Sequence, residues 1–370
     1  MKVLHIMFKH PQFNDAICYF YSNYIQEHSH EVCIINMSNE DSDLMKYSVK
    51  ISTFSVLTND DRNKLCDKFL AYDVIILHAM HLDIRMVTKI MCNRFIRNKI
   101  VCILYGYDLY RNYNIKIIKG FIVKNMMRFF YRNIQALIAI FPTDVDEYYK
   151  RYKKCNKIFY APYISGEVPH YVKMDFQKKI MAEKYSDGEP IIVQVGHSSY
   201  ANVRHFEILD QIAKFKNENI KVLLPLSYGD VEYGDRVEKY AREILGDKVI
   251  TLRDFMTLED YIELLSTVDI GIWNTHRQIG LGNINPHVYM GKKIYLSSDC
   301  IMNQFFKENN VPIFDSSSID KFDDFISDVD DSVYDDFRKE YFDTESKIKK
   351  WEAIYRWLEL NNGQKNKNAK

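Results

Sequence analysis

Two glycine-containing loops carry the residues that are best suited to chemistry. Residues 277–285, Arg-Gln-Ile-Gly-Leu-Gly-Asn-Ile-Asn, follow the apolar run 268–273. Glycines at such a strand-to-helix junction let the backbone approach a ligand closely, and the positive end of the following helix attracts an anion. A second glycine turn lies at residues 195–198. Together the two loops predict a diphosphate site, and the leaving group of a nucleotide-sugar is the anion that fits it.

The residues expected to bind this donor lie in loops that follow predicted strands. Arg277 and Gln278 add hydrogen-bond donors beside the glycine pair, and the Phe255 ring suits stacking on a nucleobase. The alternative is an ordinary turn in each loop, with Asn283 as a helix cap and Phe255 in the core. The candidate donor-binding residues are Gly196, His197, Ser198, Tyr228, Phe255, Arg277, Gln278, Gly280, Gly282 and Asn283.

A second group of residues could act on an acceptor hydroxyl. Asp108 is the lone acid between residues 85 and 132, and a carboxylate at a strand end suits general-base catalysis. His78 and His10 also follow strands and are the substitutes for this base. The alternatives are a helix cap or salt bridge for Asp108 and a structural role for each histidine. The expected acceptor-side residues are Asn14, Gly106 and Tyr110.

The sequence contains no recognisable metal or cofactor motif. It has no H-E-x-x-H pattern, and the D-x-D spacing at 144–146 is typical of a helix start. The glycine pair lacks the third glycine of G-x-G-x-x-G and lies late in the chain, so an NAD enzyme is not expected. The seven widely spaced cysteines indicate free thiols in a reducing compartment. We expect no metal and no cofactor, with Arg277 and a helix N-terminus supplying positive charge.

The charge pattern bears on possible partners. Lys+Arg and Asp+Glu are 50 each, which argues against nucleic acid. Residues 111–132 mix basic with apolar and aromatic side chains, which is typical of a helix on a membrane surface. A core helix with a solvated basic face is the alternative. No run reaches the roughly 18–20 apolar residues of a membrane span, so we expect any membrane contact to be peripheral.

Short apolar runs alternate with longer amphipathic segments, which predicts parallel sheets with helices on both faces. Two such series predict an α/β protein with two Rossmann-like domains facing a central cleft. The expected strands are residues 3–8, 31–37, 74–78, 100–104, 136–140, 157–160, 191–195, 221–226, 248–252, 270–273 and 293–296. The expected helices are residues 15–28, 60–71, 84–94, 203–217, 234–245 and 258–267.

The domain boundaries follow from a polar stretch at residues 165–190. We expect an acceptor-side domain at residues 1–165 and a nucleotide-sugar-binding domain at residues 166–340. Residues 341–370 carry apolar side chains at helical spacing and end in a polar tail. This segment is expected to pack back across the domains.

Five short motifs occur together in a fixed order: Gly106-x-Asp108-Leu109-Tyr110, Val195-Gly196-x-Ser198, Pro225-x-x-Tyr228, Asp269-x-Gly271 and Arg277-Gln278-x-Gly280-x-Gly282. In this set the chain resembles the enzymes of glycosyltransferase family 56 over residues 1–299. The resemblance implies a GT-B fold, a TDP-linked 6-deoxyhexose donor with or without an acetamido group, and a polyprenyl-diphosphate-linked saccharide acceptor. It also implies a cytoplasmic protein, peripheral on the inner face of the bacterial inner membrane.

The leading hypothesis is a metal-independent GT-B hexosyltransferase of surface polysaccharide synthesis, of the O-antigen, lipopolysaccharide or common-antigen type. No Asp or Glu lies between residues 277 and 298, which is compatible with TDP because its deoxyribose has no 2′-hydroxyl. One alternative is a sugar-nucleotide epimerase of GT-B-like form, which needs no lipid acceptor. Another is a non-catalytic carbohydrate- or nucleotide-binding partner.

Overall fold

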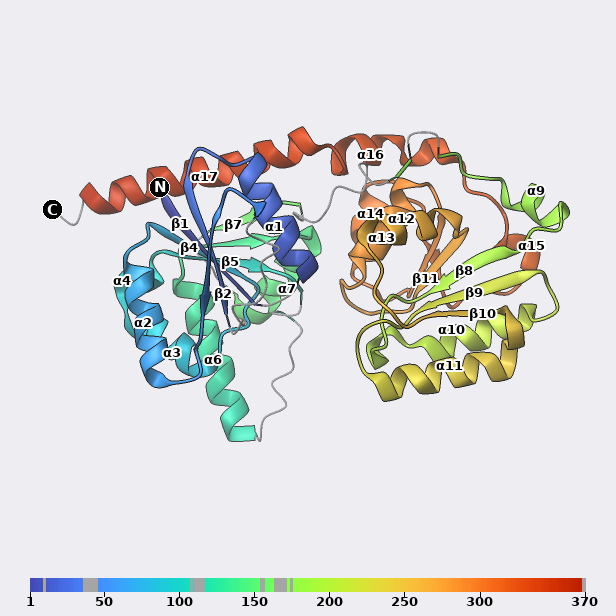
Figure 1. Ribbon diagram of the computed structural model, residues 1–370, viewed down its shortest axis with the longest axis horizontal. Helices are drawn as coiled ribbons and strands as arrows, with labels where there is room; N and C mark the ends of the chain where they lie inside the picture. Colours follow the sequence, from blue (N-terminus) through green and yellow to red (C-terminus); the bar gives the residue numbers. More distant parts are fainter. Residues whose placement is uncertain are drawn as a thin grey trace. The chain divides into compact units, whose positions relative to one another are not determined.

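The computed structural model describes residues 1–8, 11–35, 46–106, 109, 117–153, 157–162, 172–173 and 176–367. The chain divides into two compact units (Figure 1). Unit 1 comprises residues 1–166 and 344–370, and unit 2 comprises residues 167–343. Each unit is built on one parallel sheet with helices on both faces, so the predicted α/β class is confirmed.

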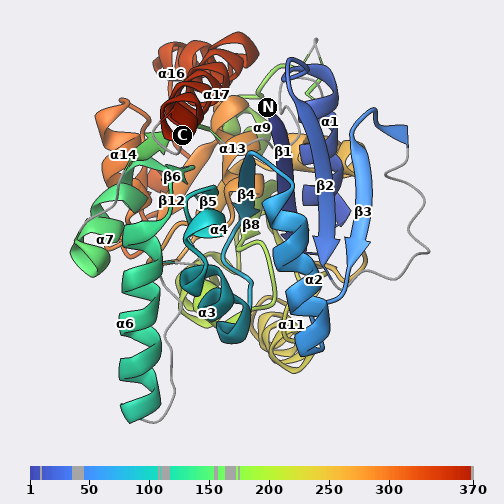
Figure 2. The same ribbon diagram turned by 90° about the vertical axis from the view of Figure 1, so that its left-hand side faces the viewer.

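Unit 1 contains a seven-stranded sheet in the order β3-β2-β1-β4-β5-β6-β7, with every pairing parallel. Figure 2 shows β3, β2 and β1 side by side at one edge. The strands are β1 (Lys2–Phe8), β2 (Ser29–Ile35), β3 (Lys50–Phe54), β4 (Val74–His78), β5 (Ile100–Leu104), β6 (Ala136–Ala139) and β7 (Ile158–Tyr160).

Two apolar cores cover the two faces of this sheet. One core joins the sheet to α2, α3, α6 and α7, and the other joins it to α1 and α17. The last helix thus returns to unit 1, where Trp351, Ile354, Tyr355 and Leu358 are buried. The helices of unit 1 are α1 (Pro11–Asn23), α2 (Asn59–Leu70), α3 (Ile84–Cys92), α4 (Arg94–Arg97), α6 (Ile117–Asn133), α7 (Pro142–Tyr152) and α17 (Thr344–Lys367).

Unit 2 contains a six-stranded parallel sheet in the order β10-β9-β8-β11-β12-β13. In Figure 1, α10 and α11 cover one face and α12 and α13 the other. The strands are β8 (Ile191–Val195), β9 (Ile220–Pro225), β10 (Val249–Leu252), β11 (Ile270–Trp273), β12 (Lys293–Leu296) and β13 (Phe314–Asp315). The α-helices are α9 (Met181–Ser186), α10 (His205–Ile212), α11 (Val231–Leu245), α12 (Leu258–Thr267), α13 (Leu281–Tyr289), α14 (Met302–Glu308), α15 (Phe322–Phe325) and α16 (Asp335–Tyr341).

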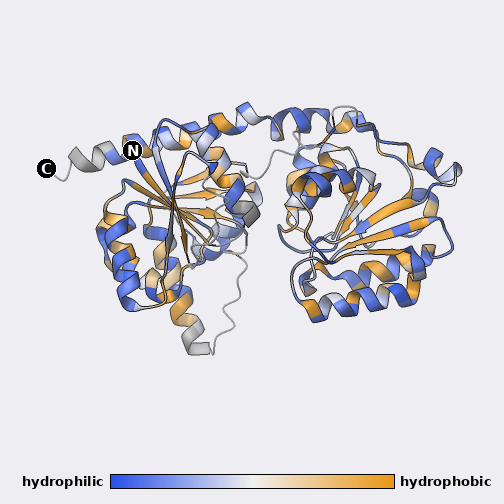
Figure 3. Ribbon diagram, viewed as in Figure 1, coloured by the Kyte–Doolittle hydropathy of each residue, from blue (hydrophilic) through white to orange (hydrophobic). Residues whose placement is uncertain are grey.

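All eleven predicted strands are confirmed within a few residues at each end, whereas β3 and β13 were missed. The predicted strands are buried apolar runs, and Figure 3 shows them as the most hydrophobic part of each unit. β3 is an edge strand with polar residues and no fully buried side chain, and β13 has only two residues. The helix predicted at residues 15–28 in fact runs from Pro11 to Asn23.

Candidate active site

Unit 2 reverses its strand order between β8 and β11, which pair with each other inside the sheet. Strands β9 and β10 extend the sheet on one side of β8, and β12 and β13 extend it on the other side of β11. In open parallel sheets, ligands bind at the carboxyl ends of the strands beside such a reversal. The loops after β8 and β11 are the two glycine loops of the sequence, so the topology brings them to one edge.

The loop after β8 begins with a glycine that both backbone and packing require. Gly196 has a φ of +71°, and its N–H donates to the Ile272 carbonyl at 2.9 Å. A Cβ here would lie 2.5 Å from Val203 Cγ1 and 2.7 Å from His205 Nε2. These distances are too short for any side chain. Gly196 therefore makes room for a buried imidazole of its own unit.

The N-terminus of helix α13 has no side-chain cap among the described residues. The N-cap is Gly280, with a φ of +80°. A Cβ on Gly280 would lie 2.8 Å from His197 Nδ1, whereas no atom of the described residues would lie within 4 Å of a Cβ on Gly282. Gly282 is exposed in the first turn, where helix N–H groups lack intrahelical partners. This helix end can therefore accept an anion beside Gly282.

A buried amide network fixes the two loops to each other. Gln194 on β8 donates from Nε2 to the Gly196 carbonyl and to Asn283 Oδ1, both at 2.8 Å. The Tyr261 hydroxyl on α12 donates to the same Asn283 oxygen. The Asn283 side-chain oxygen is thus engaged within the protein, and it holds α13 against β8.

His197 Nδ1 and Gln278 Oε1 are among the buried polar atoms around this helix end that have no hydrogen-bond partner within the described parts of the chain. The two residues are only 6% and 7% exposed. Burial, with the charge of Arg277 as the second cause, lowers the pKa of His197 to about 4, so the ring is neutral at pH 7. Buried polar atoms without partners are destabilising. A polar ligand bound here would remove that cost.

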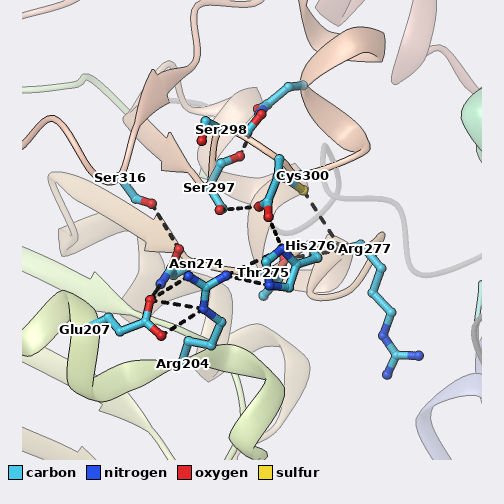
Figure 4. Close-up of polar contacts among 12 residues, drawn as sticks. Arg204, Glu207, Asn274, Thr275, His276, Arg277, Ser297, Ser298, Cys300 and Ser316 are labelled. Atoms are coloured by element: carbon cyan, nitrogen blue, oxygen red, sulfur yellow. Dashed lines mark hydrogen bonds and ion pairs between the residues drawn. The ribbon is translucent and has the colours of Figure 1, made fainter.

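Polar contacts hold the segment that leads from β11 to α13 (Figure 4). The Arg204 guanidinium contacts His276 Nε2 at 2.6 Å and Glu207 Oε2 at 2.5 Å. Because a guanidinium can only donate, Nε2 accepts, and the ring proton lies on Nδ1 facing the Asp299 carboxylate. The Arg277 side chain extends away from this cluster in Figure 4. The network therefore fixes the backbone just before Arg277.

Two aromatic rings follow the neighbouring strands β9 and β10. Tyr228 and Phe255 lie almost parallel, with centroids 6.2 Å apart and an angle of 16° between the rings. Tyr228 is 42% exposed and Phe255 is 67% exposed, so the alternative that Phe255 belongs to the core is wrong. Ser198, at the end of the loop after β8, is fully buried. The rings form an exposed aromatic surface at the same edge of the sheet as the glycine loops.

Unit 1 has its own reversal of strand order, between β1 and β4. His78 ends β4, is 5% exposed, and has its Nε2 atom 3.0 Å from His5 Nδ1. Asn14 is buried, and its Oδ1 atom has no partner among the described residues. Gly106 follows β5 with a φ of +77°. The remaining predicted residues of this side, which lie outside the described residues, are His10, Asp108 and Tyr110.

Comparison with known proteins identifies the family. The profile of a family described as "4-alpha-L-fucosyltransferase glycosyl transferase group 56" matches residues 1–354. The chain belongs to glycosyltransferase group 56. The match supports a sugar transferase over the epimerase and the non-catalytic partner, and it confirms the resemblance read from the five motifs.

Solved structures similar to this transferase share its fold at low sequence identity. A glycosyltransferase from Rickettsia africae has a TM-score of 0.69 at 13% identity, covering 96% of this chain and 98% of its own. HepE of Anabaena, solved with UDP and glucose, has a TM-score of 0.65 at 12% identity, covering 100% and 99%. The lipopolysaccharide outer core galactosyltransferase WaaB has a TM-score of 0.62 at 14% identity, covering 96% and 99%. The transferase therefore has the predicted GT-B fold.

Sequence reasoning missed several buried polar residues of the two sheets and of the helix α12. His5 and Gln194 each lie inside an apolar strand, and His30 and Tyr261 were not distinguished from their surroundings. The available signal was a polar residue in an otherwise apolar run, because such a side chain must find a buried partner.

Metal-ligating residues do not gather in the part of the transferase that the structure describes: no group of three or more His, Cys, Asp or Glu there could hold a metal ion. The D-x-D spacing at 144–146 lies in α7 near its start, as predicted. None of the helices within the described ranges is both long and apolar enough to cross a membrane.

Proposed function

We propose that this transferase moves a 6-deoxyhexose, with or without an acetamido group, from a TDP-sugar to a polyprenyl-diphosphate-linked saccharide in surface polysaccharide synthesis. The family description names a fucosyltransferase, and fucose is a 6-deoxyhexose. The acceptor class and the O-antigen or common-antigen role rest on the family resemblance.

The open N-terminus of α13 is the observation that carries the donor half of the proposal. The diphosphate binds beside Gly282 in the first turn of α13, after the N-cap Gly280, where the helix dipole and free N–H groups favour an anion. Arg277 and Gln278 assist its departure as negative charge develops on the leaving oxygen, and such preorganised donors stabilise that charge. His197 and Ser198 line the inner side of the site, and the Tyr228 and Phe255 rings provide a surface for the thymine base.

A thermal-shift panel of TDP, UDP, GDP and CMP on the full chain tests the donor. Bound nucleotide stabilises the folded state by mass action, so TDP should give the largest shift. A preference for UDP or GDP would contradict the TDP assignment.

Two variants at one position test the place of binding. Gly282→Asp adds a carboxylate that the helix dipole favours by about 0.3–1 kcal/mol, so folding is preserved while a diphosphate is repelled. Gly282→Asn has the same shape without the charge. TDP should stabilise the Asn variant and fail to stabilise the Asp variant. Equal TDP shifts in the two variants would show that the diphosphate does not bind at the N-terminus of α13.

On the acceptor side, Asp108 is the first proposed base, with His78 or His10 as its substitute. If Asp108 is the base, Asp108→Asn should abolish transfer while the TDP shift stays close to that of the unmodified chain. Retained turnover would remove Asp108 from this role.

Metal independence is part of the proposal because Arg277 and the α13 N-terminus supply positive charge where the diphosphate leaves. Turnover measured with EDTA, and again after Mg²⁺ is restored, should be the same. A rate that depends on Mg²⁺ would contradict this.

Membrane association is assigned to the basic segment 111–132, of which the structure describes α6. Phe121 and Ile122 are 68% and 58% exposed, and Lys124 is exposed beside them. Arg128 and Arg132 instead donate to the Arg151 and Tyr152 carbonyls at the end of α7, so part of the basic face is structural.

Sedimentation with phosphatidylglycerol vesicles tests this assignment. The transferase should co-sediment with the vesicles, and a Phe121→Ser/Ile122→Ser double variant should remain in the supernatant with an unchanged TDP shift. Co-sedimentation of the double variant would move the membrane contact away from α6. Such a surface would keep the protein at the cytoplasmic face of the inner membrane, where its lipid-linked acceptor lies.

A further inference from the structure

Three buried histidines form a continuous hydrogen-bonded row across the sheet of unit 1. His5 Nδ1 lies 3.0 Å from His78 Nε2, and His5 Nε2 lies 2.9 Å from His30 Nδ1. The rings belong to three adjacent strands, β4, β1 and β2. All three side chains are at most 8% exposed. We call His78, His5 and His30 the histidine row.

The row runs from the carboxyl edge of the sheet to its amino edge. His78 is the last residue of β4, His5 lies in the middle of β1, and His30 is the second residue of β2. Because the strands are parallel, the three positions lie progressively closer to the amino edge of the sheet from His78 to His30. At the carboxyl edge, His78 Nδ1 lies 3.4 Å from the hydroxyl of Tyr105, which directly follows β5.

The other end of the row comes close to the surface. His30 Nε2 has no partner with hydrogen-bond geometry in the described residues. The ring of His28, whose side chain is 6% exposed, lies 6.1 Å from that of His30, and His28 Nδ1 is 3.7 Å from the Glu359 carboxylate. A proton that reaches His30 is therefore separated by one buried ring from Glu359, whose side chain is 49% exposed.

Burial keeps the three rings neutral. It lowers the pKa of His78 to about 3 and of His30 to about 4, and it lowers the pKa of His5 well below its ordinary value. A neutral imidazole has one N–H donor and one bare acceptor nitrogen. Each contact in the row therefore needs a donor from one ring and an acceptor from the next.

This requirement couples the tautomers of the whole row. If His5 carries its proton on Nε2, it donates to His30 and must accept from His78, so all three rings are protonated on Nε2. If His5 carries its proton on Nδ1, the same reasoning places all three protons on Nδ1. The row thus has two consistent states, and they differ by the passage of one proton from end to end.

We infer that His78 and not Asp108 is the entry point for the acceptor proton, and that the histidine row relays this proton from Tyr105 and His78 at the carboxyl edge to His30 at the amino edge. The inference rests on transfer to a hydroxyl and not on the identity of the donor sugar. As the acceptor oxygen bonds to the sugar carbon and the bond from that carbon to the diphosphate breaks, the acceptor proton passes to the Tyr105 oxygen. The phenolic proton moves to His78 Nδ1.

Each later step forms one N–H bond and breaks one. The His78 Nε2 proton passes to His5 Nδ1, the His5 Nε2 proton passes to His30 Nδ1, and the His30 Nε2 proton leaves to solvent. No ring in the row has to hold a full positive charge in the apolar core, where burial opposes it. His5 and His30 act through His78 and are positioning residues.

The surroundings of the row favour this role over simple packing. The other residues on the same face are apolar, including Val3, Val32 and Ile76 of the three strands. An apolar side chain at His5 would need no partner at all. Three imidazoles placed end to end instead provide a polar path through this core, in which the rings of Tyr21 and Tyr355 pack against them.

Nuclear magnetic resonance of the full chain with ¹⁵N-labelled histidine tests the coupling of tautomers. The three rings, assigned by single His→Gln variants, should be neutral at pH 7 and share one tautomer. A protonated ring, or a mixture of Nδ1–H and Nε2–H among the three, overturns the proposal. This readout needs no substrate, so it stands even where the proposed donor fails.

Solvent isotope effects on turnover of a TDP-linked 6-deoxyhexose separate a relay from a scaffold. The proton inventory is the plot of kcat against the deuterium fraction of the solvent. For the unmodified chain this plot should be curved, because several protons move in the same step. His5→Gln should lower kcat about 100-fold, the lower end of a general-base contribution, with a linear inventory and an unchanged TDP shift. Val32→Ala, at the buried β2 position opposite His5, is the matched control and should keep the curved inventory.

A second variant keeps the test decisive where His5→Gln does not fold. His30→Gln interrupts the row at its less buried end and should also lower kcat and straighten the inventory. Full kcat in either folded variant, or a curved inventory that survives both, overturns the relay. Absence of turnover in the unmodified chain together with a single shared tautomer would instead place the failure in the proposed donor.

Discussion

Each unit buries three histidines against its sheet, but the two units accommodate them differently. In unit 1 the rings contact one another. In unit 2 each ring lies against a glycine: an added Cβ would come within 2.7–3.0 Å of the ring of His205 at Gly196, of His197 at Gly280 and of His287 at Gly271. His205 and His287 of unit 2 also have polar neighbours, the Tyr233 hydroxyl at 3.3 Å and the Asn283 carbonyl at 2.9 Å, but not another histidine. The glycines of unit 2 therefore supply the space that these rings occupy.

This difference changes the interpretation of the glycine pair at 280 and 282. Gly280 begins α13 and packs on His197, so its lack of a side chain serves the protein interior. Gly282 has no such neighbour among the described residues and remains open. The ligand-facing glycine is therefore the second of the pair.

The largest expected effect is a loss of stability in acid, which tests whether both sets of histidines are buried and neutral. Burial lowers the pKa of His197 to about 4 and of His205 and His287 to about 3, as it does in the histidine row. Unfolded histidine titrates near 6.5, so the unfolded chain gains protons first as pH falls. Stability is complete above pH 6.5 and is lost below it, by about 2 kcal/mol per histidine at pH 5.

Urea unfolding at pH 7 and pH 5 measures this loss. Because the units can unfold separately, each transition reports one set of rings. If the urea midpoint of a unit is the same at both pH values, the histidines of that unit are not held neutral by burial. The prediction would then be wrong for that unit.

Gly196→Ala should give the next largest effect. The left-handed backbone adds about 1–2 kcal/mol of strain, and the overlap with Val203 and His205 adds about 1–3 kcal/mol. We expect unit 2 to lose about 3 kcal/mol in urea unfolding, the sum of these contributions. The transition of unit 1 is the internal control and should not move. A loss in unit 2 no greater than in the Gly282→Ala variant would show that the loop relaxes freely.

Gly280→Ala probes the contact between one glycine and one ring, because the three atoms nearest to the added Cβ all belong to His197. His197→Ala should relieve the overlap, so a double-mutant cycle should yield a coupling of about 1–2 kcal/mol. The strain of the left-handed backbone remains in the double variant. Additive effects would mean that His197 moves aside without cost, and Gly280 would then be needed for its backbone alone.

Gly282→Ala should have the smallest effect and the opposite sign. The new methyl group meets no described atom and reduces the freedom of the unfolded chain, so unit 2 should gain about 0.5 kcal/mol. Urea unfolding beside the Gly280→Ala variant gives the matched comparison. A destabilised Gly282→Ala variant would indicate a neighbour at this position and would weaken its assignment as the open glycine.

The sequence predicted the elements better than it predicted the contacts between them. Ile100–Leu104 is a buried apolar run and was recognised without ambiguity, whereas the half-buried edge strand Lys50–Phe54 has no such run. The order of motifs along the chain placed Gly196 and Gly280 in loops. The order of motifs could not show that Gly196 packs against His205 or that Gly280 packs against His197. Those contacts depend on the order of strands in the sheet, which decides which loops lie next to each other.

The histidine row shows the same limit. His5 is one polar residue in an apolar strand, and its partners lie 25 and 73 residues away. Only the strand order β2-β1-β4 brings the three rings together. The general-base candidates of the sequence included His78 for its place after a strand, but its connection to His5 and His30 depends on register.

The return of α17 to unit 1 has a consequence for how the chain is made. Unit 2 is one continuous stretch, while unit 1 lacks Trp351, Ile354, Tyr355 and Leu358 until the last helix is synthesised. At roughly 5–20 residues per second, a ribosome needs about 10–35 s to add unit 2. During that interval α1 is the helix that covers this face of the nascent sheet, and the part that α17 covers later stays open. We therefore expect the nascent sheet to engage a chaperone, and we expect the second unit of the sequence to finish folding first.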